Sequence, residues 1–136
     1  MKKLIICLII SMLILPTSLH KAKNNDIITA KLINAIIKVE SNFNHKAVSN
    51  KGAIGLMQIR YSVWKNELKK HNIINTKQDL FNKSKNVNAG VFILRQYLKK
   101  NNNDLEKALV KYSSNATNYY NKVMANMPKE WYGKYW

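Results

Sequence analysis

The segment from Ile27 to Glu40 constrains the fold most, because its apolar residues recur at helical spacing and lead directly to an acid. Asp26 stands where its carboxylate can cap the first turn, so we expect a helix from about Ile27 to Glu40. At about 100° per residue, Glu40 falls between Ile33 and Ile36 on the apolar side. Burial disfavours the charged form, so the Glu40 pKa should rise. This suits general acid catalysis; a structural glutamate held by a buried lysine or by backbone donors is the alternative.

Four later segments also have helical patterns, and none has the alternation of a strand of convincing length. A loop is expected at 41–53, turned by Gly52, and another at 72–79. Two helices are expected from about Met57 to Lys70 and from Asn86 to Lys100. A third is expected to begin at a capping box formed by Asn103 and Glu106, and a fourth to run from Asn118 to Met127. Gly90 weakens the second of these helices, which indicates a close contact with another helix there. The sequence therefore predicts an all-α fold.

The N-terminus has the pattern of a secretory signal. Lys2 and Lys3 precede an apolar run from Leu4 to Leu15, and Pro16 ends that run. We predict a signal peptide at residues 1–22, with an uncleaved N-terminal anchor as the alternative, and one catalytic domain at residues 23–136. The protein is then exported to the periplasm or the cell envelope.

The 136-residue chain carries a formal charge of +16, which is compatible with an anionic polymer such as cell-wall glycan as partner. The coding bias of an AT-rich genome, which enriches Lys, Asn and Ile together, is the alternative origin of this charge. Nucleic acid is disfavoured because Arg60 and Arg95 are the only arginines, and base and phosphate reading relies on arginine forks. The histidines show no His-Glu-x-x-His arrangement, and the single cysteine lies in the signal segment. We therefore predict no metal site and no nucleic-acid partner.

A motif follows the first helix. Residues 40–58 read ESNFNHKAVSNKGAIGLMQ. This resembles the soluble lytic transglycosylase (SLT) domain of the goose-type-lysozyme-like group, whose signature has the form ES-x-F-x-x-x-A-x-S-x-x-G-A-x-G-L-M-Q. Residues 86–90 with Tyr97 and Leu98 resemble the N-I-x-x-G…Y-L helix of that family. Residues 111–115, KYSSN, stand in place of its A-Y-N-A-G. The resemblance implies a lysozyme-like helical domain with a glycan-binding cleft.

The same resemblance implies roles for individual residues. Glu40 would be the catalytic residue, and the Tyr112 hydroxyl would hydrogen-bond it; a core aromatic is the alternative for Tyr112. Ser41 would support Glu40 or bond the local backbone. The predicted substrate-binding residues are Gly55, Leu56, Met57 and Gln58 of the cleft turn, Ser113 in place of the family asparagine, and Tyr119 of the last helix. Met57 could instead fill the core and Gln58 could be a helix cap or a surface residue, while Phe43 is expected in the core.

The carboxylates favour a reaction with one acid. Most glycosidases need two, and none of the other acids after the signal segment lies in the motif loop: Asp26, Glu67, Asp79, Asp104, Glu106 and Glu130. The resemblance implies that Glu40 protonates the MurNAc–GlcNAc oxygen and then, as a base, helps to close a 1,6-anhydro ring. It also implies that this reaction needs no cofactor. A hydrolytic lysozyme and a non-catalytic basic envelope-binding protein are the alternatives. The expected partner is peptidoglycan. A further hypothesis is that the protein acts together with a secretion or conjugation machinery that spans the envelope. We expect a monomer.

Overall fold

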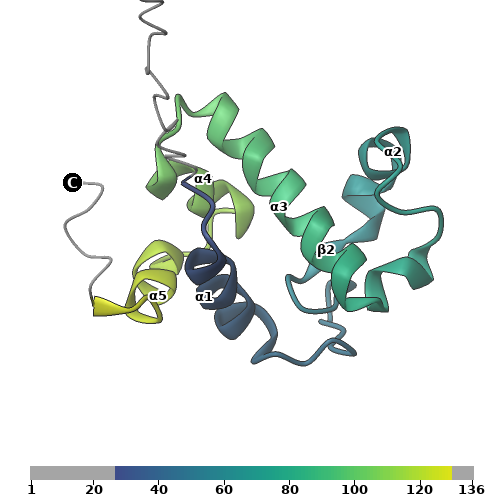
Figure 1. Cartoon of the computed structure of the whole chain (residues 1–136), viewed down its shortest axis with the longest axis horizontal. Coiled ribbons are helices and arrows are strands. Elements are labelled where there is room, and N and C mark those ends of the chain that lie inside the picture. The colour runs from purple at the N-terminus through teal and green to yellow at the C-terminus, as the bar shows by residue number, and fades with distance from the viewer. Residues whose placement is uncertain (1–26, 130–136) are drawn as a thin grey trace, which may run out of the picture.

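The computed structural model describes residues 27–129, which are mostly helical (Figure 1). In chain order the elements are α1 (Ala30–Ser41), β1 (Ala53–Ile54), β2 (Ile59–Arg60), α2 (Tyr61–Lys70), η1 (Lys77–Phe81), α3 (Lys83–Lys100), α4 (Leu105–Tyr112) and α5 (Tyr119–Ala125). The predicted all-α fold class is confirmed. The two strands form a short antiparallel hairpin that pairs Ala53 with Arg60 and Ile54 with Ile59. Strands of two residues carry no readable alternation, so they could not be predicted from the sequence.

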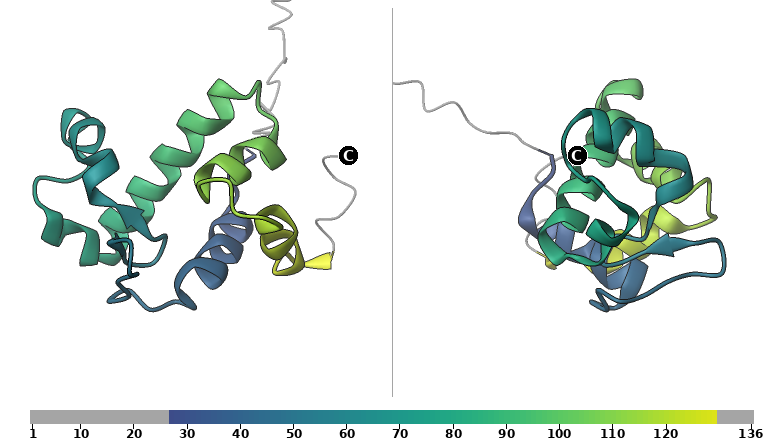
Figure 2. Two further views of the ribbon diagram at one scale, coloured as in Figure 1. Left: turned by 180° about the vertical axis from the view of Figure 1, so that it is seen from behind. Right: turned by 90° about the vertical axis from the view of Figure 1, so that its right-hand side faces the viewer.

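Helix α3 is the central element (Figure 1). It packs against α4 and η1, while α1 packs against α5. Figure 1 and the view from behind in Figure 2 place α2 on one side of α3, and α1 and α5 on its other side. The buried face of α3 supplies much of the core through Ala89, Gly90, Ile93, Leu94 and Leu98. A continuous apolar stripe on one long helix thus organises the shorter elements around it.

The helix starts differ from the predicted ones for local reasons. Helix α1 begins at Ala30, because the Thr29 hydroxyl accepts from the backbone N–H of Leu32 at 3.2 Å. The expected cap, Asp26, lies outside the described residues. Helix α4 is capped by Asp104, whose carboxylate accepts from Lys107 N at 3.0 Å. Asn103 has φ of 62°, a left-handed conformation, so the predicted capping box at Asn103 is wrong.

Two further boundaries were also misplaced. The helix expected from Met57 begins only at Tyr61, because the preceding residues form the cleft turn and β2. Helix α3 begins at Lys83, three residues before the predicted Asn86, since the Asn82 side chain accepts from Lys85 N at 3.0 Å. The predicted polar loop at 72–79 includes the start of η1.

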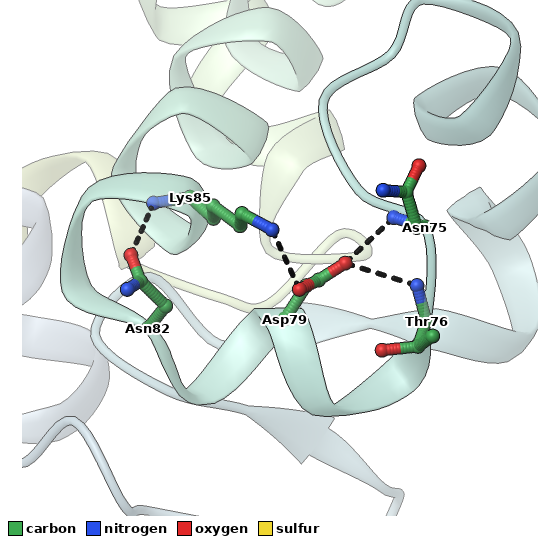
Figure 3. A network of polar contacts seen from close by, with 5 residues as sticks. All are labelled: Asn75, Thr76, Asp79, Asn82 and Lys85. Atoms are coloured by element: carbon green, nitrogen blue, oxygen red, sulfur yellow. Dashed lines mark hydrogen bonds and ion pairs between the residues drawn. The ribbon is translucent and has the colours of Figure 1, made fainter.

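Asp79 joins the chain before η1 to the first turn of α3 (Figure 3). Its Oδ2 accepts from the backbone N–H groups of Asn75 at 2.6 Å and Thr76 at 3.0 Å, and its Oδ1 accepts from Lys85 Nζ at 2.7 Å. The hydrogen bond from Lys85, followed by those from Thr76 and Asn75, holds the Asp79 pKa well below its usual range. This acid therefore has a structural role at the junction of η1 and α3.

The predicted signal peptide or anchor at residues 1–22 lies outside the described residues. None of the helices in residues 27–129 is both long and apolar enough to cross a membrane.

Candidate active site

One buried side chain, that of Asn86 on α3, hydrogen-bonds the backbone of the Gly-Leu-Met-Gln turn and of the segments beside it. Asn86 is 1% exposed. Its Oδ1 accepts from Met57 N at 2.8 Å, and its Nδ2 donates to the carbonyls of Ile54 at 2.9 Å and Leu80 at 2.7 Å. Both polar atoms of the Asn86 side chain thus form hydrogen bonds with backbone groups, as burial of an amide requires. Asn86 therefore positions the turn and does not reach the cleft surface.

Glycine is required at two places around this turn. Gly55 has φ of 77°, and a Cβ there would lie 2.5 Å from Leu80 O and 2.3 Å from Asn86 Nδ2. A Cβ at Gly90 would lie 2.3 Å from Met57 Sδ. The close contact expected at Gly90 is therefore present, and it is made with the turn rather than with another helix. Met57 itself is fully buried, which agrees with its alternative as a core residue.

Glu40 lies in the last turn of α1, where its carboxyl group is partly buried. The Tyr119 hydroxyl of α5 donates to Glu40 Oε1 at 2.5 Å. Burial raises the Glu40 pKa above its ordinary value, and the hydrogen bond from Tyr119 partly opposes that rise. The raised pKa predicted from the helical position of Glu40 is confirmed in direction.

The predicted hydrogen bond from Tyr112 to Glu40 is wrong. The Tyr112 hydroxyl donates to the backbone carbonyl of Met57 at 2.8 Å, and Tyr119 takes the expected place on Glu40. Tyr112 nevertheless lies close enough for the Glu40 charge to act on it: burial first, and then that charge, raise the Tyr112 pKa well above its usual range. Tyr119, predicted as a substrate-binding residue, instead contacts the candidate acid directly.

Ser41 bonds the backbone, which was one of its two predicted roles. Its hydroxyl lies 2.8 Å from the Leu56 carbonyl and 3.3 Å from the Ile37 carbonyl, as donor to each. The first contact joins the end of α1 to the cleft turn. Ser41 therefore fixes the position of Glu40 relative to the turn without touching the carboxyl group.

A cleft of about 280 Å³ opens beside Glu40. Three segments line it: the end of α1, the hairpin with its preceding turn, and the chain from the end of α4 to α5. Its lining residues are Glu40, Ser49, Lys51, Ala53, Gln58, Arg60, Tyr112, Ser113, Ser114, Ala116 and Tyr119. The structure thus brings five predicted site residues to one cleft: Glu40, Gln58, Tyr112, Ser113 and Tyr119.

The other predicted substrate-binding residues do not line this cleft. Gly55, Leu56 and Met57 are buried beneath its wall. Gln58 reaches the cleft, although its Nε2 donates to the Gly55 carbonyl at 3.0 Å and so partly serves the turn. Phe43, expected in the core, is 53% exposed, because Asn42 and Phe43 both have left-handed φ values and direct the chain away from α1.

Six of the lining residues were not predicted from the sequence: Ser49, Lys51, Ala53, Arg60, Ser114 and Ala116. Arg60 had a readable signal, since it is one of only two arginines and stands two residues after the motif. Lys51 had none, because it is one lysine among many. The hairpin, which the pattern analysis did not detect, brings both cations to the cleft.

Glu40 is the only acid among the described residues that line the cleft. Asp79 is paired with Lys85 at 2.7 Å, and Asp104 with Lys107 at 2.8 Å. Within residues 27–129, no group of three or more metal-ligating side chains is close enough to hold a metal ion. The arrangement can supply a proton and take one back through Glu40, and no second carboxylate of residues 27–129 lines the cleft.

A helical domain built on one long central helix, with a lone acid in an open cleft, has the lysozyme-like architecture. Residues 17–131 match the model of the family described as the transglycosylase SLT domain, and the chain belongs to this family. The resemblance seen in the sequence is confirmed.

Among solved structures, the chain is similar to the 70 kDa soluble lytic transglycosylase of Escherichia coli, with 25% sequence identity and a TM-score of 0.59. The match covers 73% of this chain and 16% of the E. coli chain. The chain therefore spans only a small part of that protein's length.

Proposed function

We propose that the protein is a peptidoglycan lytic transglycosylase that cleaves the MurNAc-β-1,4-GlcNAc bond and leaves 1,6-anhydro-MurNAc ends. Membership of the SLT family and likeness to a soluble lytic transglycosylase support this class of reaction. The observation that carries the proposal is the lone Glu40 carboxyl group, raised in pKa and facing the cleft.

In the first step, protonated Glu40 gives its proton to the glycosidic oxygen between MurNAc and GlcNAc. The C1–O bond breaks, the GlcNAc hydroxyl leaves, and the positive charge at C1 is stabilised by the N-acetyl oxygen of the same MurNAc. In the second step, the Glu40 carboxylate removes the proton from the C6 hydroxyl of MurNAc. The C6 oxygen then bonds to C1, which closes the ring and returns Glu40 to its protonated form.

Tyr119 suits this double role. Burial stabilises the protonated form of a carboxylic acid, but it disfavours the carboxylate form that the second step needs. The hydroxyl of Tyr119 donates to Glu40 and so favours the carboxylate form. Burial and Tyr119 therefore act on the two halves of the cycle: the first favours the proton donor, and the second stabilises the base.

Mass spectrometry of the fragments released from purified sacculi tests the proposal. The wild-type protein should release muropeptides with anhydro ends, whereas Glu40→Gln should release none, because the amide keeps the shape but delivers no proton. We expect a loss beyond the roughly 10²–10⁴-fold of ordinary acid–base help, since one group does both steps. Glu67→Gln, the same change on the exposed side of α2, is the control and should keep the activity.

Two results would contradict the proposal. Reducing ends in place of anhydro ends would identify a hydrolytic muramidase. Absence of any release by a folded wild-type protein would point to the non-catalytic envelope-binding alternative.

The proposal also fixes where the protein must act. Its substrate lies outside the cytoplasmic membrane, so we place the protein in the periplasm or the cell envelope, delivered by the N-terminal segment. Fractionation of cells that express the full chain, followed by N-terminal sequencing, tests both delivery and cleavage of residues 1–22.

A further inference from the structure

Two cations in the cleft have no role in the reaction just described. Arg60 and Lys51 line the cleft beside Glu40. Arg60 stands on β2 directly opposite Ala53, and paired residues of an antiparallel ladder present their side chains to the same face. No carboxylate in residues 27–129 forms an ion pair with either cation. The described lining of the cleft therefore carries two positive groups and one acid whose pKa is raised.

Arg60 is held in a defined position. Its Nη2 donates to the Ser114 hydroxyl at 2.9 Å, a contact between residues 54 apart in the sequence. This bond uses one of five guanidinium donors, and Ser114 is the only hydrogen-bond partner of the guanidinium among the described residues. On its other side, Arg60 borders a small pocket shared with Trp64 and Tyr97, whose rings pack edge to face at 5.7 Å. The bond to Ser114 and the partial burial of the side chain restrict the orientation of its remaining donors.

The chemistry of the substrate supplies a matching group. Of the two sugars in peptidoglycan, N-acetylglucosamine is neutral, whereas the muramyl unit carries a lactyl carboxyl group. That group is a free carboxylate in peptide-free glycan, and it is an amide in peptide-bearing glycan, where the stem peptide brings its own carboxylates. A guanidinium fork matches a carboxylate in shape and charge.

We propose that Arg60, oriented by Ser114 and assisted by Lys51, binds a carboxylate of the muramyl unit and thereby selects the substrate presented to Glu40. The inference rests on the proposed function. It makes Arg60 a specificity-determining residue, separate from the acid–base chemistry of Glu40.

Binding measured without turnover tests the inference. In a Glu40→Gln background, isothermal titration calorimetry is carried out with four defined MurNAc–GlcNAc tetrasaccharides. Two are peptide-free, one with the lactyl acid and one with its methyl ester. Two bear stem peptides, one with free and one with amidated peptide carboxylates. The first pair tests the lactyl source of the carboxylate, and the second pair tests the peptide source.

We expect the acid of at least one pair to bind more tightly than its neutral partner. Arg60→Met should weaken the binding of that acid by about 10- to 100-fold, which corresponds to the usual free energy of a hydrogen bond to a charged group. The affinity for the neutral ligand should stay within about twofold of its value before the substitution. Arg60→Lys keeps the charge but loses the fork, so it should recover only part of the preference. Lys69→Met removes a positive charge from an exposed position on α2 outside the cleft, and should leave the preference unchanged.

Equal affinity for acid and neutral ligands in both pairs, a preference that survives Arg60→Met, or no measurable binding would overturn the inference. Equal affinity for acid and neutral ligands overturns the inference without any variant at Arg60. If Arg60→Met does not fold, Arg60→Lys tests the guanidinium fork, and a full acid preference in Arg60→Lys would overturn the inference. The two proposals also fail separately. If the protein prefers the acid ligands but releases no anhydro products, only the proposed reaction is contradicted. If it releases anhydro products but shows no preference for the acid ligands, only the proposed carboxylate site is contradicted.

Discussion

The proton on Glu40 is under two opposed influences, and their balance decides the pH range in which the cleft can work. Burial favours the neutral acid, and the Tyr119 hydroxyl favours the carboxylate. The first step of the proposed reaction needs the neutral acid, so the rate should fall as the pH rises through the Glu40 pKa. Any change at Tyr119 should therefore appear as a shift of the alkaline limb of the pH–rate profile.

Tyr119→Phe tests this balance. The variant loses the hydrogen bond that lowers the Glu40 pKa, so that pKa rises and the alkaline limb of kcat/KM moves to higher pH. At the optimum we expect a rate about 10- to 100-fold lower, since a hydrogen bond to a charged group is worth about 1.5–3 kcal/mol and each 1.36 kcal/mol is tenfold. Kinetics on sacculi between pH 4 and pH 9 measure both effects; an unshifted limb would contradict the role of Tyr119.

Tyr112→Phe is the matched control, because it removes the other tyrosine hydroxyl near Glu40. That hydroxyl donates to the Met57 carbonyl, so its loss should cost about 1 kcal/mol of unfolding free energy and leave the alkaline limb in place.

The exchange of roles between these two tyrosines shows what the sequence can predict at the scale of a residue. Helical spacing placed Glu40 on the buried side of its helix, and this was sufficient to predict the direction of its pKa shift. Spacing could not decide which tyrosine bonds Glu40, because the contact joins α1 to α5 across 79 residues and depends on how the helices pack. The family pattern pointed to Tyr112, whose hydroxyl is instead used by the backbone of the cleft turn.

At the scale of elements, one side chain of α3 connects the hairpin, the turn and η1. Asn86→Ala would leave Met57 N, Ile54 O and Leu80 O without the partner that Asn86 supplies. Each buried polar group left unsatisfied costs about 1–3 kcal/mol, so we expect a loss of at least about 3 kcal/mol in the free energy of unfolding. Urea denaturation measures this loss. Asn88→Ala, two residues along on the exposed face of α3, should change stability by less than about 0.5 kcal/mol.

Asp79→Asn tests the junction of η1 and α3. The folded-state pKa of Asp79 lies below its ordinary value of 3.8, so its carboxylate stabilises the folded protein above that pH, and the contribution is lost as the pH falls. The variant should therefore melt at a lower temperature than the wild type at pH 7, and the gap should narrow as the pH falls below 3.8. Melting curves at pH 7, 4 and 2.5 measure the gap. A gap that does not depend on pH would show that the carboxylate charge is not what holds residues 75–79.

Element boundaries were predicted less well than element types. The apolar stripe of α3 was plain in the sequence, yet its first turn carries polar residues and is fixed by the Asn82 cap, which periodicity does not detect. The hairpin was missed for a different reason. Its strands are too short to have a pattern, and they are stabilised by Asn86 from a helix 32 residues away from Ile54. Tertiary contacts of this kind decide local structure that propensity leaves open.

At the scale of the whole molecule, the formal charge of +16 should govern how the protein meets an anionic wall. Salt shortens the range of such attraction, from about 10 Å at 0.1 M to about 3 Å at 1 M. We expect the initial rate of sacculus cleavage to fall by roughly threefold or more between 0.05 M and 0.5 M NaCl, because long-range steering is lost. Cleavage of short soluble glycan fragments, which carry few charges, should fall less. The same salt dependence for both substrates would show that the net charge has no part in wall association.

The fold class and the family could be predicted from the sequence, because helical periodicity and a dense motif are both local signals. The cleft could be predicted only in part. Its lining combines α1, the hairpin and the chain between α4 and α5, and only their packing shows that Arg60 and Ser114 touch.

The contact between Tyr119 and Glu40 also sets a condition on when the acid exists. Helix α5 has only seven residues, and helices that short do not persist in water without tertiary contacts. Elements of this kind open locally far more often than a whole domain unfolds. Each opening of α5 would let water reach Glu40 and return its pKa toward the ordinary value of 4.5. The carboxyl group would then hold its proton less tightly until the helix closed again. Amide hydrogen exchange along α5 therefore reports how often Glu40 loses the burial that raises its pKa.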